Sequence, residues 1–287
     1  MLIRTGIKNA ARHVVADVVY YSGAAALMHR LRTNQAARIL TYHEISVSPK
    51  DPFSVDVRQF RIQMSYLKEK FHVISLRDYR EIAAKNLPIP KGSVVITFDD
   101  GLSSFIKYAY PVLKEKNIPA TCFIVAAKPG SGDARFMAWP DIERIASEGL
   151  IEIGSHSLSH RSLGALGYEE ICKETAKSKA LIENELNYPV YAFSYPYGTR
   201  SDLNDEVVKA VRDAGYEIAV TSINGVNRGA QDMFRLKRTK IERGDDFMLF
   251  KKIMFGALDS WILIDLFFNF LQKKKGPPVS LFEKDTA

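Results

Sequence analysis

Several features that mark other protein classes are scarce or missing in this sequence. Its 287 residues include only two cysteines, Cys122 and Cys172, and neither belongs to a C-x-x-C pair. A zinc knuckle or a dense disulfide framework is therefore not expected. The sequence also lacks a glycine-rich dinucleotide-binding signature, which argues against an open, doubly wound sheet.

The body of the chain has no excess of basic residues. The net charge of +7 lies at the two ends, because residues 1–38 carry six basic residues against one acidic and residues 271–287 carry four against two. Residues 39–270 are therefore neutral overall. We expect no nucleic-acid partner, since such a partner calls for a basic groove.

Neither end contains a long apolar run without charges. Near the start, "HVVADVVYYSGAAALM" is interrupted by Asp17 and followed by "HRLR" where a small-residue cleavage site would stand, so a cleaved signal peptide is not expected. Near the end, "IMFGALDSWILIDLFFNFLQKKK" contains Asp259, Asp265 and Asn269. Each central aspartate costs about 2.5–3.5 kcal/mol in a bilayer, so a spanning helix is not expected.

The two ends remain both apolar and basic, and two interpretations stay open. Such segments can hold a protein peripherally on an anionic membrane, or they can be helices packed on the body with solvated charges. We therefore expect a peripheral membrane-associated or cytoplasmic protein. We divide it into a basic amphipathic segment (1–37), a barrel domain (38–250) and an apolar helix with a basic tail (251–287).

From residue 38 onward, short β-branched runs alternate with longer helical patterns. The candidate strands are "RILTYH", "HVIS", "SVVITFDD", "ATCFIVA", "IEIGSH", "VYAFSY", "EIAVTS" and "FRLKRTKI". The candidate helices include "VRQFRIQMSYLKEK", "FIKYAYPVLKEK", "WPDIERIASEG", "YEEICKETAKSKALIENEL" and "DEVVKAVRDAG". This alternation predicts an α/β fold with a parallel sheet, and seven or eight such units favour a closed or nearly closed (β/α) barrel.

Polar residues gather where four of these strands end. They are Asp99 and Asp100 in "VVITFDDG", His156 and His160 in "IEIGSHSLSH", Tyr195, Pro196 and Tyr197 in "YAFSYPYG", and His43 in "ILTYH". In such barrels the chemistry gathers at the carboxyl ends of the strands. We therefore expect a functional site there.

These residue types are suited to a catalytic metal. His156 and His160 are four apart, so on a helical turn their rings would share one face. Two imidazoles and one carboxylate make a three-ligand site with open positions for water, as in catalytic zinc sites. Of the two adjacent aspartates, one can bind the metal while the other acts as general base. The acidic metal site of a nucleotide-sugar transferase and a simple Asp-Gly turn are the alternatives.

Together the motifs "TFDDG", "HSLSH" and "YPYG" resemble the polysaccharide deacetylases (NodB homology, carbohydrate esterase family 4) over residues 39–245. The resemblance implies a distorted (β/α) barrel that hydrolyses N- or O-acetyl groups on sugars with a divalent metal, usually zinc. The same ligands accept Co²⁺ or Ni²⁺. The resemblance also implies a role for each site residue. Asp99 would be the base, Asp100, His156 and His160 would bind the metal, and the backbone N–H of Tyr197 would help to stabilise the oxyanion.

Two departures from the family pattern stand out. Ser194 occupies the position of the usual arginine, and the Asp-Trp element that braces this arginine in the family is not evident either, so both are absent together. No histidine follows His160 to act as general acid. Some biofilm polysaccharide deacetylases, which this sequence resembles more closely, place that histidine in an early "YH" motif. If the barrel closes, the first strand lies beside the last, and we therefore assign the general acid to His43; a merely packed strand-end histidine is the alternative.

Aromatic residues of the third motif are candidates for substrate contact. Pro-Tyr-Gly turns commonly expose an aromatic ring, so Tyr195 and Tyr197, with Pro196 between them, could line an acyl-binding rim or simply pack. The leading hypothesis is metal-dependent removal of the N-acetyl group from an amino sugar in a polysaccharide or lipid-linked glycan. A catalytically weak glycan-binding homologue, suggested by Ser194, and an amidohydrolase of a small non-sugar amide are the alternatives.

Overall fold

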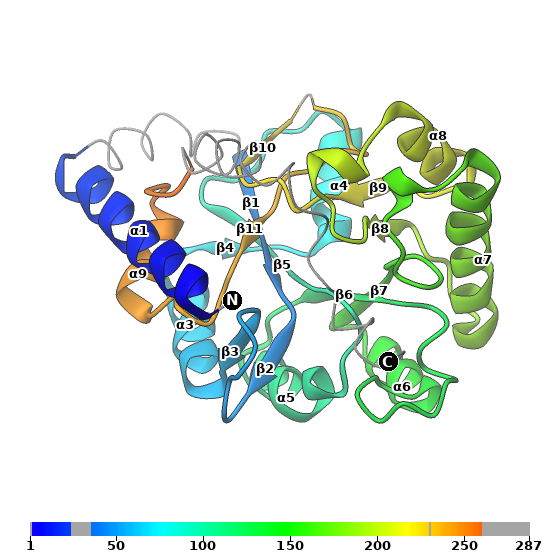
Figure 1. Ribbon diagram of the computed structural model, residues 1–287, viewed down its shortest axis with the longest axis horizontal. Coiled ribbons are helices and arrows are strands. Elements are labelled where there is room, and N and C mark those ends of the chain that lie inside the picture. The colour runs from blue at the N-terminus through cyan, green and yellow to red at the C-terminus, as the bar shows by residue number, and fades with distance from the viewer. Residues whose placement is uncertain (1, 24–35, 230, 260–287) are drawn as a thin grey trace.

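The computed structural model describes residues 2–23, 36–229 and 231–259. A curved, mostly parallel sheet forms its centre, and helices cover the outer side of this sheet (Figure 1). The distorted (β/α) barrel predicted from the sequence is confirmed.

Each strand and helix predicted between residues 38 and 250 is present. The strands are β1 (Ala36–Tyr42), β2 (Glu44–Ser46), β3 (Ser54–Asp56), β4 (His72–Val73), β5 (Ser93–Phe98), β6 (Ala120–Ile124), β7 (Ile151–Ser155), β8 (Ala192–Ser194), β9 (Ile218–Val220), β10 (Asn227–Arg228) and β11 (Thr239–Lys240). The helices are α1 (Leu2–Tyr21), α3 (Val57–Lys70), α4 (Leu76–Ala84), η1 (Phe105–Ala109), α5 (Tyr110–Lys116), α6 (Trp139–Ser147), η2 (Leu163–Ala165), α7 (Tyr168–Leu186), η3 (Arg200–Asp202), α8 (Asp205–Asp213) and α9 (Phe247–Met254).

The main sheet runs in the order β10-β1-β5-β6-β7-β8-β9. All pairs from β1 to β9 along this path are parallel, whereas β10 is antiparallel to β1. Both faces of the sheet are covered, so β5 reads as the continuous buried run "SVVITF". Val94 and Ile96 pack toward the helices, while Val95 packs in the barrel interior. The same alternation carries Thr97 and Asp99 inward at the carboxyl end of β5.

A short segment near the end of the chain closes most of the gap between the last and the first strand. Leu236 forms a parallel bridge with Val220 of β9, and Thr239 of β11 pairs with Leu40 of β1. The strand predicted over "FRLKRTKI" therefore links the two edges of the curled sheet. Between its two pairing points lies Arg238, a residue only 1% exposed.

Helix α1 packs against α9 on the outside of the barrel (Figure 1). Arg12 is buried and forms ion pairs with Glu242 and with Asp245, the latter at 2.9 Å. Ala16 joins the main hydrophobic core. For α1, the structure thus agrees with a helix packed on the body.

The predicted C-terminal segment lies mostly outside the described residues, and the division at residues 37 and 250 stays a prediction. None of the described helices is long and apolar enough to cross a membrane.

Replacing Arg12 by methionine tests the attachment of α1. Without the guanidinium, the buried carboxylates of Glu242 and Asp245 lose their partner, so we expect the free energy of unfolding to fall by about 3–5 kcal/mol. Arg61→Met is the matched control, because Arg61 and Glu115 form an exposed ion pair. Its loss should cost under about 1 kcal/mol. Urea denaturation measures both, and equal stability of the two variants would contradict the structural role of Arg12.

Candidate active site

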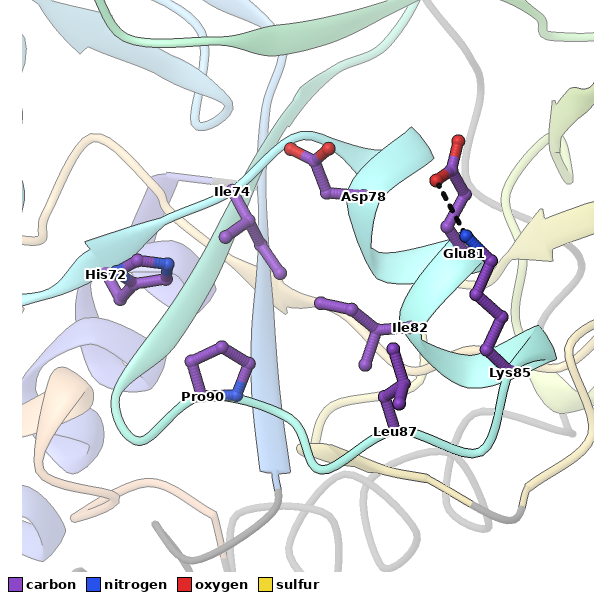
Figure 2. Close-up of a pocket in the computed structure, with 8 residues that line it drawn as sticks. All are labelled: His72, Ile74, Asp78, Glu81, Ile82, Lys85, Leu87 and Pro90. Atoms are coloured by element: carbon purple, nitrogen blue, oxygen red, sulfur yellow. Dashed lines mark ion pairs between the residues drawn. The ribbon is translucent and has the colours of Figure 1, made fainter.

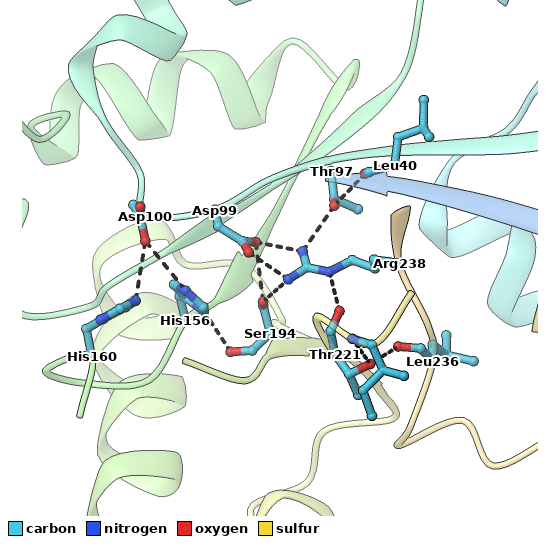
Figure 3. Close-up of polar contacts among 11 residues, drawn as sticks. Leu40, Thr97, Asp99, Asp100, His156, His160, Ser194, Thr221, Leu236 and Arg238 are labelled. Atoms are coloured by element: carbon cyan, nitrogen blue, oxygen red, sulfur yellow. Dashed lines mark hydrogen bonds and ion pairs between the residues drawn. The ribbon is translucent and has the colours of Figure 1, made fainter. Parts of the chain in front are cut away.

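Three side chains from two strand ends converge on one point. Asp100 follows β5, and His156 and His160 lie in the loop after β7. The Nε2 atoms of both histidines are 3.5 Å from Oδ1 of Asp100 (Figure 3). Two donors of a tetrahedral zinc ion with bonds of about 2.1 Å lie roughly 3.4 Å apart. All three donor atoms lie within 4.8 Å of one another and are buried, so the cluster has the dimensions of a metal site.

Hydrogen bonding fixes His156 for metal binding. Its Nδ1 lies 2.8 Å from the backbone oxygen of Ser194 at the end of β8. Because a carbonyl only accepts, Nδ1 is the donor, and the lone pair of Nε2 is directed to the cluster. Metal-binding histidines commonly have such a partner on their second nitrogen.

The loop that carries the two histidines is not helical, which corrects the expected helical turn. Ser157 and His160 have φ values of +63° and +64°, and these left-handed residues bend the loop so that the two rings lie 4.8 Å apart. Glu174 of α7 holds the bend, because its Oε2 accepts from the backbone N–H groups of Leu158 and Ser159 at 3.0 and 2.9 Å.

Unusual backbone geometry concentrates around this cluster. Among the described residues, non-glycine residues with positive φ are either asparagines or members of the site: Asp100, Ser157, His160 and Tyr197. Such conformations are costly for residues other than glycine or asparagine and persist where the surroundings enforce them. Gly101 follows Asp100 with φ +71°, and a Cβ there would lie 2.8 Å from Ile124. The turn after β5 therefore requires glycine.

Asp99 points inward and is held by Arg238 of the closing segment (Figure 3). The guanidinium donates to both carboxylate oxygens, Nη1 to Oδ1 at 2.8 Å and Nη2 to Oδ2 at 2.6 Å. Ser194 accepts from Arg238 and donates to Asp99. Burial is the largest single effect and raises the pKa of Asp99, but the Arg238 charge, the Arg238 hydrogen bonds and the neighbouring histidines together outweigh it and hold this pKa well below its usual range.

This arrangement supplies a guanidinium although the third motif lacks its usual arginine. Ser194 does replace it at that position, yet Arg238 reaches the same carboxylate from another strand. The sequence reasoning missed Arg238. A signal was present, because Arg238 is in phase with buried Leu236 in an alternating strand.

The remaining charges favour a cation in the cluster. Burial raises the pKa of Asp100 to about 8, and the adjacent Asp99 carboxylate adds to this increase. Burial also lowers the pKa values of His156 and His160, so both imidazoles are neutral at neutral pH. A buried carboxylate beside two neutral donors lacks a compensating charge, which a divalent ion would supply.

Comparison with known proteins agrees with this geometry. Residues 86–219 match the family model of the polysaccharide deacetylases. That match contains Asp99, Asp100, His156 and His160. Residues 86–219 form a polysaccharide deacetylase domain.

Individual relatives extend the similarity over more of the chain. YxkH of Bacillus subtilis, a polysaccharide deacetylase by name, is 29% identical over 217 residues, 75% of each chain. Poly-β-1,6-N-acetyl-D-glucosamine N-deacetylase of Staphylococcus aureus is 26% identical over 208 residues, 68% of this chain and 70% of that protein.

Solved structures share the fold. Deacetylase PplD of Streptococcus pyogenes, in complex with acetate, has a TM-score of 0.68 at 24% identity and covers 75% of this chain and 98% of its own. IcaB of Ammonifex degensii has a TM-score of 0.67 at 23% identity and covers 78% and 97%.

Two residues of interest lie outside the matched range 86–219. His43 follows β1, and Arg238 lies in the closing segment. The His43 ring lies 5.3 Å from that of Phe53. Its Nδ1 is buried without a hydrogen-bond partner among the described residues. Burial lowers the pKa of His43 to about 3, although the Asp99 carboxylate opposes this. His43 thus belongs to the charge environment of the deacetylase site, and its role stays a prediction.

Tyr195 does not line a substrate rim, which corrects that expectation. Its side chain is 1% exposed, lies 5.3 Å from Phe193 and donates from its hydroxyl to the backbone oxygen of Phe234 at 2.9 Å. Pro196 is also buried. Tyr197 is only half-buried, and its ring lies 5.1 Å from His160. Of the three residues, only Tyr197 borders the metal cluster with an accessible ring.

A surface pocket lies at the other end of the deacetylase sheet (Figure 2). Its volume is about 300 Å³, and its lining includes His72, Ile74, Ile82 and an ion pair between Glu81 and Lys85. His72 pairs with Ser93 at the start of β5, whereas Asp99 and Asp100 follow its end. The pocket is therefore separate from the candidate active site.

Replacing Arg238 by methionine tests the Asp99–Arg238 pair. Asp99 would stay buried without a compensating charge, so we expect the free energy of unfolding to fall by about 3–5 kcal/mol. Lys237→Met removes the neighbouring, exposed cation and should change the free energy of unfolding by under about 0.5 kcal/mol. Chemical denaturation compares the two. An Arg238→Met protein as stable as Lys237→Met would refute the inward pair.

Replacing Glu174 by alanine tests the shape of the histidine loop. Two backbone N–H groups lose their acceptor, so the ligands are less well positioned, and we expect zinc affinity to fall by about 10–100-fold. Competition with a chromophoric chelator measures this affinity without reference to activity. Glu170→Ala on the same helix removes only an exposed partner of Arg161 and should leave the zinc affinity unchanged. If the Glu174→Ala and Glu170→Ala variants bind zinc equally well, Glu174 has no positioning role.

Proposed function

We propose that this protein hydrolyses the N-acetyl group of an amino sugar in a polysaccharide or lipid-linked glycan. The observation that carries this proposal is the buried trio of Asp100, His156 and His160 directly beside Asp99, whose two oxygens are held by Arg238. The staphylococcal relative, named for poly-β-1,6-N-acetyl-D-glucosamine, makes a β-1,6-linked N-acetylglucosamine polymer the first substrate to test.

Asp100, His156 and His160 would hold the divalent ion, for which zinc is the first choice and Co²⁺ or Ni²⁺ are acceptable. When bound, such an ion lowers the pKa of water and polarises a carbonyl oxygen. These two effects are the ones that amide hydrolysis needs. The donor set fits this role, because three protein ligands leave positions for water and substrate.

Asp99 accepts the proton of the attacking water. Arg238 and Ser194 fix the orientation of its carboxylate, at some cost in basicity. Burial raises the pKa of Asp99, but the Arg238 charge and hydrogen bonds, together with the neighbouring histidines, lower it by more. The carbonyl carbon gains the water oxygen, and the backbone N–H of Tyr197 donates to the developing oxyanion. The left-handed backbone at Tyr197 (φ +60°) belongs to the turn that sets the direction of this N–H.

His43 delivers a proton to the departing nitrogen as the C–N bond breaks, so that the products are acetate and a free amine. Because burial lowers the pKa of His43 to about 3, its imidazole is neutral between turnovers. It must first receive a proton, and Asp99 gives up for this purpose the proton that it accepted from water, which returns Asp99 to its carboxylate form. Once protonated, it is a strong acid toward an amine.

The alternative of a catalytically weak glycan-binding homologue loses its support. That alternative was suggested by Ser194 at the position of the usual arginine, whereas Arg238 supplies the guanidinium. Hydrolysis of a small non-sugar amide is a further outcome that the substrate test distinguishes.

Acetate release from β-1,6-linked N-acetylglucosamine oligomers, with and without added Zn²⁺ or Co²⁺, tests the function. Asp99→Asn should lower the rate by about 10²–10⁴-fold, since the carboxamide cannot accept the proton. Asp133→Asn, in an exposed loop, should retain the rate. A chelator should abolish activity and zinc should restore it. Full metal-dependent activity of Asp99→Asn would disprove the assigned base, and saturable glycan binding without acetate release would favour a binding protein.

A further inference from the structure

Helix α1 has an apolar face that is largely exposed, with Lys252 of α9 in contact only at its Tyr21 end. Val14, Val18 and Tyr21 are 61%, 65% and 72% exposed. Their spacing of four and three residues places them on one side of the helix. The opposite side packs on the barrel through Arg12 and Ala16, so α1 is apolar on both sides.

This stripe differs from the other exposed apolar residues. Elsewhere among the residues whose burial is described, large exposed apolar side chains occur singly, as Val47, Ile62, Leu87, Tyr168 and Met248. Single exposed residues need no explanation, whereas a contiguous stripe marks a surface that binds something.

The sequence that contains this stripe is basic. Residues 1–38 carry a net charge of +5 and residues 271–287 carry +2, against a neutral body. Helix α1 itself packs on α9, where the ring of Tyr20 lies 6.0 Å from that of Phe255. Arg12 and Arg38 are neutralised by buried ion pairs. The net positive charge of residues 1–38 therefore comes from the other basic residues of this sequence segment: Arg4, Lys8, Arg30 and Arg32.

We propose that the stripe formed by Val14, Val18 and Tyr21 binds the surface of an anionic lipid bilayer. An apolar helix face accompanied by basic residues is the combination that binds such surfaces. A second copy of this helix, or the lysine-rich end of this chain, would bring like charges together, whereas an anionic bilayer neutralises both segments. The proposal is independent of the deacetylase activity.

Flotation of the full-length protein with phosphatidylcholine vesicles, with and without phosphatidylglycerol, tests this proposal. At low salt the protein should float with the anionic vesicles only. The variant Val14→Ser/Val18→Ser/Tyr21→Ser keeps the net charge but loses the apolar stripe, and its binding should fall at least about tenfold. Because these side chains are exposed, its unfolding midpoint should match that of the wild type.

Ile62→Ser/Leu87→Ser is the matched control, since it removes exposed apolar residues outside the stripe. It should float like the wild type. A wild-type protein that stays soluble with anionic vesicles overturns the proposal, and so does a triple variant that floats as well as the control. Self-association that is lost only in the triple variant, without any flotation, would assign the stripe to a second copy and overturn it as well.

Discussion

Two adjacent carboxylates, Asp99 and Asp100, are buried at the end of one strand, and much of the site is arranged around their mutual repulsion. Two like charges in contact with little solvent cannot both persist without compensation. Arg238 supplies it for Asp99 through two hydrogen bonds. Asp100 instead faces His156 and His160, which are neutral. The divalent cation that we propose for this cluster would supply the missing charge, and the same requirement separates the proposed base from the proposed ligand.

Closure of the barrel makes this compensation possible. The segment from Leu236 to Lys240 bridges β9 and β1 and carries Arg238 inward. Directly after it, Glu242 and Asp245 bind Arg12 of α1. The first helix of the chain therefore braces the turn that follows the arginine-bearing segment. In this way the outer surface of α1, where we propose lipid contact, is connected through one buried ion-pair network to the segment that holds the base.

Much of the fold and the metal cluster could be predicted from the sequence, because both depend on local patterns. Alternating apolar strands and helical periodicity identified the elements, and strand ends identified Asp100, His156 and His160. Arg238 was missed because its partner is 139 residues away, and only barrel closure brings them together. The spacing of four between His156 and His160 predicts a helical turn for the histidine loop. That spacing does not reveal the left-handed backbone at Ser157 and His160. Burial of Tyr195 likewise depends on packing from distant elements.

A crystal structure of the zinc-soaked protein, with anomalous diffraction at the zinc edge, tests the central arrangement most directly. The account predicts one strong peak bonded to Oδ of Asp100 and to Nε2 of His156 and His160 at about 2.0–2.2 Å, with Arg238 on both oxygens of Asp99. A peak elsewhere, or an Asp99 carboxylate turned away from Arg238, would contradict it.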